Sequence, residues 1–221
     1  DRYTLEYRSE IVEPLLTTVA HGSSLCVVGL AGAGKSNLTR FVAEPEVLGH
    51  YLPESIAQAM HVVTVQCHPG TQPSSHFYRT LLNELQPVAR KVHYPLRVPK
   101  EDVTAYDVRE VIKHFCETAR QRIVIVLDEF ESLIKHQPLE FFEELRNVRD
   151  EVRTTSRFAY VAITHRMPHK VVGNQRFENS KLYELLREQM YALGPYRPAD
   201  ATAMLHSLAA RENLTIDAGH L

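Results

Sequence analysis

Short apolar segments alternate along this chain with longer segments in which apolar residues recur every three or four positions. The short segments are rich in β-branched residues and end at glycine, proline or polar residues, which is typical of strands. They lie at 25–29, 61–67, 123–127, 158–164 and 187–193. The longer segments have the spacing of amphipathic helices. They lie at 11–19, 37–42, 75–89, 104–119, 139–153 and from 198 onwards. This alternation predicts an α/β fold with a doubly wound parallel sheet, which binds ligands at the carboxyl ends of its strands.

Several segment ends carry residues with a restricted backbone or a capping side chain. Pro14 is expected in the first turn of the first helix, where its missing N–H costs no hydrogen bond. Pro45 is expected to follow the end of the helix after the first strand. Thr104 and Asp107 have the spacing of a capping box. Residues 90–103, which contain two prolines, are expected to form a loop.

A glycine-rich segment follows the first strand and reads GLAGAGKS over residues 29–36. This is the G-x-x-x-x-G-K-S pattern, and its place between a strand and a helix lets backbone N–H groups and the helix N-terminus point at phosphate oxygens. Gly32 and Gly34 allow backbone angles that a side chain would resist. Lys35 is expected to reach the β- and γ-phosphates of ATP and act in catalysis, and the Ser36 hydroxyl to bind Mg²⁺. The residues predicted to bind ATP or ADP here are Gly29, Ala31, Gly32, Ala33, Gly34, Lys35, Ser36 and Asn37.

Two carboxylates follow the most apolar strand. Residues 123–127 are five consecutive apolar residues, which predicts a strand covered on both faces, and Asp128 and Glu129 come directly after it. Asp128 is expected to hold Mg²⁺ beside Ser36, directly or through water. Glu129 is predicted to orient the attacking water and accept its proton. The next carboxylate, Glu131, is interpreted as a solvated or capping residue.

The strand at 158–164 ends in three polar residues, Thr164, His165 and Arg166. In nucleotide hydrolases with an Asp-Glu pair, the strand after the acidic one lies beside the loop strand, so we expect its tip to face the γ-phosphate. Thr164 can hydrogen-bond the phosphate or the lytic water, and Arg166 can pair with a phosphate through two N–H groups. We therefore take Thr164 and Arg166, rather than His165, as candidate catalytic residues. The alternative is a solvated start of a loop.

The composition narrows the class of protein. The chain has 221 residues with 44% apolar content, which suits one α/β domain and the start of a second. Its net charge of −2 gives no global basic field that would indicate nucleic acid. The three cysteines lie far apart in apolar segments, which indicates core residues in a reducing, cytoplasmic compartment. The twelve histidines form no clear set of metal ligands. No apolar run reaches the roughly 18 residues of a membrane span, and the missing initiator methionine indicates an excised piece.

These motifs together resemble AAA+ and STAND-type P-loop ATPases. Residues 7–10 are similar to the Gly-Arg-x-Glu segment before the domain in STAND and origin-recognition-like ATPases, with Tyr7 in place of glycine. Residues 125–131 resemble the acidic motif of origin-recognition-like members, and residues 164–166 the end of the STAND sensor strand. Residues 179–201 are similar to the passage into the helical lid of STAND ATPases. The resemblance implies a five-stranded parallel sheet in the order 5-1-4-3-2 and the beginning of a C-terminal helical lid.

The same resemblance implies a domain division and a site for the base. It places the ATPase core with its N-terminal helix at 1–194 and a truncated lid at 195–221. Pro195 and Tyr196 are expected near the adenine, although Tyr196 as a plain hydrophobic hinge residue is an equal alternative. The expected arginines of the family, one acting from a neighbouring subunit and one in the lid, have only weak candidates. These are Arg176 and Arg187 for the first and Arg197 and Arg211 for the second.

Three functions fit these features. The leading interpretation is a Mg²⁺-dependent ATPase module that acts as a conformational switch in a signalling, regulatory or defence protein, with self-association or an effector domain beyond the chain end. The alternative is a DNA-handling AAA+ ATPase of the replication-initiator or transposition-accessory type. Its local support is a basic segment at 90–100 and an arginine cluster at 146–157, which is interleaved with acidic residues and better explained as an ion-paired helix face. A small-molecule kinase is the third, although kinases of this class usually carry a substrate lid rather than an Asp-Glu pair.

Overall fold

A parallel sheet of five strands forms the centre of the computed structural model, which describes residues 3–67, 73–152 and 155–211. The strands lie side by side in the order β2-β3-β4-β1-β5. They are β1 (Leu25–Gly29), β2 (Met60–Gln66), β3 (Arg122–Asp128), β4 (Phe158–Thr164) and β5 (Met190–Leu193). All four neighbouring pairs are parallel. The observed order is the predicted order 5-1-4-3-2 read from the other edge, so the predicted fold class is confirmed.

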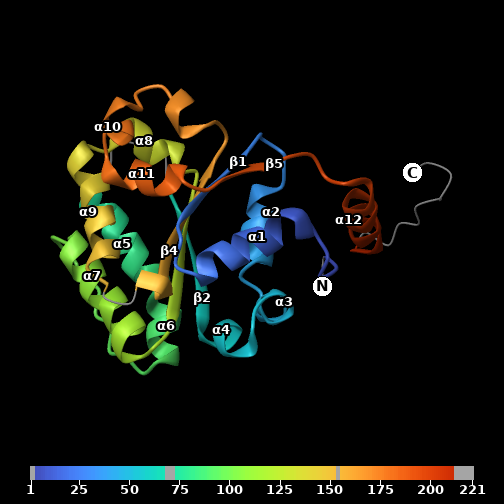
Figure 1. Cartoon of the computed structure of the whole chain (residues 1–221). Helices are drawn as coiled ribbons and strands as arrows, with labels where there is room; N and C mark the ends of the chain where they lie inside the picture. The colour runs from blue at the N-terminus through green and yellow to red at the C-terminus, as the bar shows by residue number, and fades with distance from the viewer. Residues whose placement is uncertain (1–2, 68–72, 153–154, 212–221) are drawn as a thin grey trace.

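Helices cover both faces of the sheet (Figure 1). One face carries α1 (Ser9–Ala20), α2 (Lys35–Phe41), α3 (Pro45–Tyr51) and α4 (Glu54–Ala59). The opposite layer contains α5 (Ser74–Glu84), α6 (Gln86–Lys91), α7 (Ala105–Lys113), α8 (Glu131–His136), α9 (Leu139–Asp150), α10 (Gln175–Glu178) and α11 (Lys181–Arg187). The last helix, α12 (Pro198–Arg211), follows β5 and lies beyond α2 (Figure 1). The result is a three-layer α/β/α domain.

The central strand β3 shows why five apolar residues occur in a row. Ile123, Ile125 and Leu127 belong to the core cluster under the α5–α11 layer, whereas Val124 and Val126 belong to the cluster under α1 and α2. Successive side chains of a strand point to opposite faces. Because both faces are covered by helices, every position of this strand must be apolar. The predicted two-sided burial is therefore confirmed.

Two helix predictions need correction. Helix α1 begins at Ser9, so Pro14 lies in its second turn and not in the first. The predicted single helix over 75–89 is two helices, α5 and α6. Pro87 lies in the first turn of α6, where a residue without an N–H loses no helical bond. The chain therefore starts a new helix at this proline instead of continuing the old one.

The predicted capping box at the start of α7 is confirmed. The Asp107 carboxylate accepts hydrogen bonds from the backbone N–H and the hydroxyl of Thr104, both at 2.8 Å. The helix continues as a π-helical turn over His114–Thr118, which together with α7 spans the predicted segment 104–119 almost completely.

Five short helices have no counterpart among the predictions: α3, α4, α8, α10 and α11. Each has four to seven residues. At 3.6 residues per turn, such a helix has too few turns to repeat an apolar spacing. Within the described residues, no helix is long and apolar enough to cross a bilayer.

The strand register brings the carboxyl ends of the sheet together. Val28 lies opposite Thr164, Gly29 opposite Leu193, and Gln66 opposite Asp128. The glycine-rich loop, the acidic pair, the tip of β4 and the linker after β5 therefore leave the sheet at one edge. This edge is the place where ligands bind in doubly wound sheets.

Candidate active site

A cleft of about 480 Å³ opens at this edge and is called the loop cleft below. Its wall combines the loop after β1, the ends of β3 and β4, the linker after β5, and α12. The lining residues are Ala31, Gly32, Gly34, Lys35, Ser36, Asn37, Asp128, Glu129, His165, Tyr196 and Met204. Nine of these eleven were predicted as site residues from the sequence. Five other predicted residues do not line it: Gly29, Ala33, Pro195, Thr164 and Arg166.

Two glycines shape the loop for different reasons. Gly32 and Gly34 both have positive φ, 79° and 84°, a region that strains any residue with a side chain. A Cβ on Gly32 would meet open space, so this glycine is needed for its backbone angle alone. A Cβ on Gly34 would collide with the hydroxyl of Tyr196. Gly34 therefore also makes room for the linker after β5.

The Lys35 ammonium is held by its own loop. Its Nζ donates to the carbonyl oxygens of Gly29 at 2.8 Å and Leu30 at 2.9 Å. Burial lowers the pKa of Lys35, and the carboxylates of Glu131, Asp128 and Glu129 act against that lowering. A fixed cation thus lines the cleft, and three carboxylates are near enough to favour its charged form.

The two carboxylates after β3 have different environments. Asp128 is buried, and its oxygens accept from Gln66 Nε2 at 2.9 Å and from the backbone N–H of Glu129 at 3.0 Å. Glu129 is exposed and has a left-handed backbone, with φ of 56°, which turns the chain from β3 toward α8. A strained backbone at a cleft wall is a common property of functional sites. One carboxylate is therefore immobilised, and the other projects from a turn.

The chemistry of a magnesium site is available in the cleft. Ser36 and Asp128 both line it and offer a hydroxyl and carboxylate oxygens, the ligand atoms that Mg²⁺ prefers. Gln66 orients the carboxylate of Asp128 from the neighbouring strand. The donor set fits this ion. Among the described residues, no group of three or more His, Cys, Asp or Glu side chains forms a metal cluster.

The tip of β4 differs from the prediction. Thr164 is fully buried, and its hydroxyl lies 3.7 Å from Sγ of Cys26, which belongs to the core cluster under the α5–α11 layer. Because side chains alternate along a strand, the next residue, His165, points to the other side and lines the loop cleft. Arg166 lines a neighbouring pocket instead. The structure therefore brings His165 to the cleft, rather than Thr164 or Arg166.

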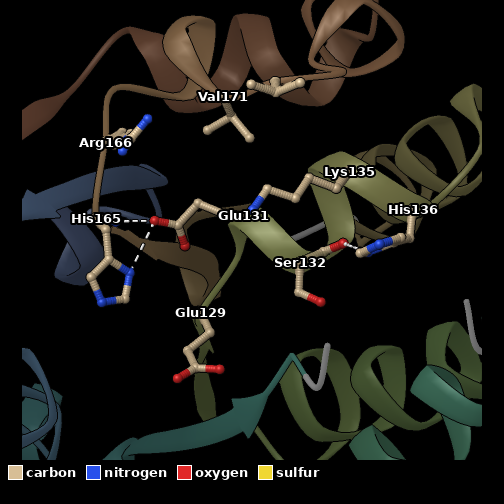
Figure 2. A pocket seen from close by; sticks show the side chains of 9 residues that line it. Glu129, Glu131, Ser132, Lys135, His136, His165, Arg166 and Val171 are labelled. Atoms are coloured by element: carbon tan, nitrogen blue, oxygen red, sulfur yellow. Dashed lines mark hydrogen bonds and ion pairs between the residues drawn. The ribbon is translucent and has the colours of Figure 1, made fainter. Parts of the chain in front are cut away.

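The neighbouring pocket has a volume of about 500 Å³ and is called the side pocket below (Figure 2). It is lined by Glu129, Glu131, Ser132, Lys135, His136, His165, Arg166, Val171 and Val172. Glu131 was interpreted as a solvated or capping residue, and this is wrong. Its side chain is 12% exposed, and Oε1 accepts from the backbone N–H and from Nδ1 of His165, the latter at 3.1 Å. The first residue of α8 is thus bonded to the tip of β4.

Arg8 connects the cleft to the N-terminal helix, and sequence reasoning did not place it in the site. It precedes α1 in a left-handed conformation, with φ of 48°, and is 1% exposed. Its guanidinium donates to Ala33 O at 2.9 Å and Gly194 O at 3.1 Å, and lies 4.2 Å from the ring centroid of Tyr196. The available signal was the resemblance of residues 7–10 to a family motif.

Tyr196 lies against the loop. Its hydroxyl accepts a hydrogen bond from Asn37 Nδ2 at 3.2 Å, and its ring packs on the Arg8 guanidinium. Pro195 is exposed and does not line the cleft. The linker therefore contributes one side chain, and Arg8, the loop and the linker form a connected unit called the Arg8 clamp below.

Comparison with known proteins identifies the family. Residues 19–180 match the profile of the family described as AAA domain. The chain belongs to this family. It is 24% identical over 204 residues to the ORC1-type DNA replication protein 2 of Sulfolobus acidocaldarius, covering 85% of this chain and 45% of that protein.

Solved structures show the same fold at low identity. The Aeropyrum pernix ORC2 protein, solved in ADPNP and ADP complexes, has a TM-score of 0.65 and 16% identity over 91% of this AAA domain and 50% of that chain. A Walker-type ATPase of Pyrococcus abyssi has a TM-score of 0.65 and 16% identity, and the match covers 95% of this chain and 59% of that chain. The chain spans about half the length of these relatives. The resemblance to origin-recognition-like AAA+ ATPases is confirmed.

Proposed function

We propose that this AAA domain binds ATP with Mg²⁺ in the loop cleft and hydrolyses it. The observation that supports the proposal is that two separate segments, the loop after β1 with Lys35 and Ser36 and the end of β3 with Asp128 and Glu129, line one cleft. Lys35 supplies a fixed positive charge for the phosphates, and the loop N–H groups and the start of α2 add theirs. Ser36 and Asp128 would hold Mg²⁺, which neutralises phosphate charge when bound. Glu129 orients the attacking water and accepts its proton.

We further propose that the domain works as a DNA-handling ATPase of the origin-recognition type. The relatives support this alternative better than the signalling switch. The ORC1-type protein of Sulfolobus acidocaldarius is a DNA replication protein, and the Aeropyrum pernix ORC1 protein, similar at a TM-score of 0.62 and 19% identity over 92% of this chain and 49% of that one, was solved with DNA. Nucleotide-dependent self-association fits the same class, with Arg176 and Arg187 as candidates to act on a neighbouring subunit.

The charged surface favours one of the two basic segments for DNA. In the arginine cluster at 146–157, Arg146 and Arg149 pair with Asp150, and Arg157 donates to Cys116 O. These charges are engaged within the domain. In contrast, four basic side chains at 90–100 are exposed: Arg90, Lys91, Arg97 and Lys100. This segment includes the end of α6, at the end of the sheet away from the loop cleft (Figure 1). DNA bound here would leave the cleft open.

The nucleotide proposal is tested by two substitutions with different expected effects. Lys35→Ala should remove measurable ATP binding, since the phosphates lose their fixed charge. Glu129→Gln should keep ATP binding but reduce hydrolysis by at least about 100-fold, because an amide cannot accept the proton of water. Calorimetric titration measures the first and phosphate release the second. Lys91→Ala, which removes a distant lysine, is the matched control. Retained binding in Lys35→Ala would contradict the site, and unchanged turnover in Glu129→Gln would show that another group activates water.

The DNA proposal is tested by the salt dependence of binding to a labelled duplex. The affinity should fall steeply with salt, because basic side chains that neutralise DNA phosphates release condensed counterions. Replacing the four exposed basic residues of 90–100 by alanine should make the logarithmic salt slope shallower by about 0.9 for each phosphate that is no longer neutralised. Lys35→Ala serves as the control, because it removes a charge outside this segment. A duplex affinity that does not respond to salt would refute DNA binding by this domain.

A further inference from the structure

The strand β2 forms one edge of the sheet, and no other strand of the described chain pairs with its outer side. On the inner side, all seven residues of Met60–Gln66 pair with β3 in one continuous register. Edge strands are usually protected from pairing with other chains by lysine, proline, an inward charge or a bulge. The strand β2 has no bulge in this register and contains no Lys, Arg, Asp, Glu or Pro. Its edge therefore favours pairing with a further strand.

The hydrogen bonds at the end of β2 show which backbone groups face outward. The N–H of Cys67 donates to Asp128 O at 2.9 Å. Because backbone groups alternate sides along a strand, the odd-numbered residues bond to β3 and the even-numbered residues face the open side. In the middle of the strand these are Val62 and Thr64, whose N–H and C=O groups form no hydrogen bond with the rest of the described chain. Two donors and two acceptors are thus available to an added main chain.

A groove of about 760 Å³, called the edge groove below, lies beside these groups. Helices of both layers line it together with β2: α3 and α4 form one wall, and the end of α5 with α6 forms the other (Figure 1). Apolar side chains dominate both walls, with Pro45, Leu48 and Ala57 on the first and Pro87 and Val88 on the second. Successive side chains of an added strand would face the two walls in turn. Apolar residues therefore fit at successive positions of such a strand.

The two walls decide which occupant fits. Two sheets join edge to edge only if their edge strands approach to about 4.8 Å. A second copy of this domain would carry the same helices beside its own β2, so the walls of the two copies would meet before the strands. The described C-terminal part, β5 and α12, lies at the opposite edge of the sheet, four strand spacings or about 19 Å away. The occupant that fits is an extended segment of another protein, which has no walls of its own.

The charged side chains of the groove define one end of this segment. Glu84 and Lys91 both belong to the α5–α6 wall, are exposed and form no ion pair with a described residue. Burial lowers the pKa of His61, and the charge of Lys91 adds to this, so Lys91 lies near the amino end of β2. An acidic residue fits opposite Lys91, whereas Glu84 disfavours acidic residues in the rest of the segment. An antiparallel strand, which pairs slightly better than a parallel one, brings its carboxyl end to this place.

We propose that the edge groove binds an extended segment of a partner protein, which adds to β2 as an antiparallel sixth strand. The segment has apolar residues at successive positions and an acidic residue at its carboxyl end, beside Lys91. Main-chain hydrogen bonds with Val62 and Thr64 provide affinity, and the two walls select the side chains. Among the described residues, none lines both this groove and the loop cleft, so the segment and a nucleotide can bind together.

The test titrates the domain with a labelled peptide of about eight residues, built of valine and threonine and ending in two aspartates. Fluorescence anisotropy gives the affinity, and amide hydrogen exchange followed by NMR gives the place of binding. Bound peptide should slow exchange of the Val62 and Thr64 N–H groups at least about tenfold, whereas Val63, already bonded to β3, should exchange slowly in both states. A peptide methylated at its main-chain nitrogens should bind at least about tenfold more weakly, because it cannot donate to the strand.

Two variants test the edge and the charge. Thr64→Pro removes an outward donor without removing a bond to β3, and should weaken binding at least about tenfold. Thr64→Val keeps the N–H and is the matched control, with an expected change below about twofold. Lys91→Glu should weaken binding about fivefold, and a peptide ending in two lysines should bind this variant better than the original domain. DNA is left out of the assay, because Lys91 also belongs to the basic segment at 90–100.

The outcomes separate the possible occupants. No binding of the aspartate peptide, or no slowing of exchange at Val62 and Thr64, would overturn the proposal. Equal affinities of the methylated and unmethylated peptides would exclude strand addition. A dimer of the free domain that the peptide dissociates would identify a second copy as the occupant, and would likewise overturn the partner segment. If Thr64→Pro does not fold, the methylated peptide and Lys91→Glu still decide the question.

Discussion

Arg8→Ala should lower the free energy of unfolding of the domain by about 3 kcal/mol, because it removes the centre of the Arg8 clamp. The guanidinium is buried and donates to two backbone carbonyls, Ala33 O at 2.9 Å and Gly194 O at 3.1 Å. Hydrogen bonds from a charged donor contribute about 1.5–3 kcal/mol each. Stacking on Tyr196 adds to this. Removing the buried charge also removes its desolvation cost, which offsets part of the loss. Arg8 Nε is buried and has no hydrogen-bond partner among the described residues, so the low end of the range applies.

Thermal and urea unfolding, followed by circular dichroism, measure this loss. For a domain of this size, about 3 kcal/mol corresponds to a decrease in Tm of about 6–12 °C. Arg40→Ala is the matched control, since Arg40 also donates to a carbonyl, Ser36 O at 3.1 Å, but is exposed. It should change stability by less than about 0.5 kcal/mol. Arg8→Gly should be about 1 kcal/mol less damaging than Arg8→Ala, because glycine tolerates a φ of 48°. An Arg8→Ala variant as stable as the control would refute the clamp.

Three further predictions concern a cap, a glycine and the thiols. Thr104→Ala should cost about 1 kcal/mol in urea unfolding, with Thr104→Ser restoring stability; equal stability of all three proteins would exclude a contribution from the cap. Gly34→Ala should cost about 1–3 kcal/mol through its positive φ and its collision with Tyr196, and adding Tyr196→Ala should recover part of it; no recovery would remove the collision from the explanation. Burial raises the pKa of the Cys26 and Cys116 thiols to about 12, so about one in ten thousand is ionised at pH 8 and a disulfide reagent should react with them only after unfolding. Fast labelling of either thiol in the folded protein would contradict their burial.

The glycine-rich loop and the acidic pair could be predicted from the sequence because each is a contiguous segment with its own backbone chemistry. The pattern GLAGAGKS needs positive φ at fixed positions, and Gly32 and Gly34 have it. Asp128 and Glu129 follow an apolar strand whose end is marked by the loss of hydrophobicity. Parallel strands have their carboxyl ends at one edge, so the two segments had to meet. This reasoning needs no knowledge of side-chain contacts.

The remaining parts of the site depend on contacts between distant segments. Glu131 and His165 are 34 residues apart along the chain. They form a hydrogen bond because the first residue of α8 lies beside the residue that follows β4. No local pattern distinguishes such a carboxylate from a solvated one. The structure places His165 rather than Thr164 at the loop cleft, because Thr164, the last residue of β4, is fully buried; the prediction did not consider to which side of the strand each of these side chains points. Arg8 was missed because its hydrogen-bond partners, the carbonyl oxygens of Ala33 and Gly194, lie 25 and 186 residues away along the chain.

The sheet order has a consequence for how the chain folds during synthesis. The strand β1 is the first to leave the ribosome, but its neighbours are β4 and β5, and Leu25 pairs with Val161. At about 5–20 residues per second, β1 waits roughly 7 to 27 seconds for β4 to be made. During this time the apolar segment Leu25-Cys26-Val27-Val28 has two open edges, a state that favours association with other chains. The strand that carries the phosphate loop is therefore the part of this domain most in need of protection by a chaperone before the chain is complete.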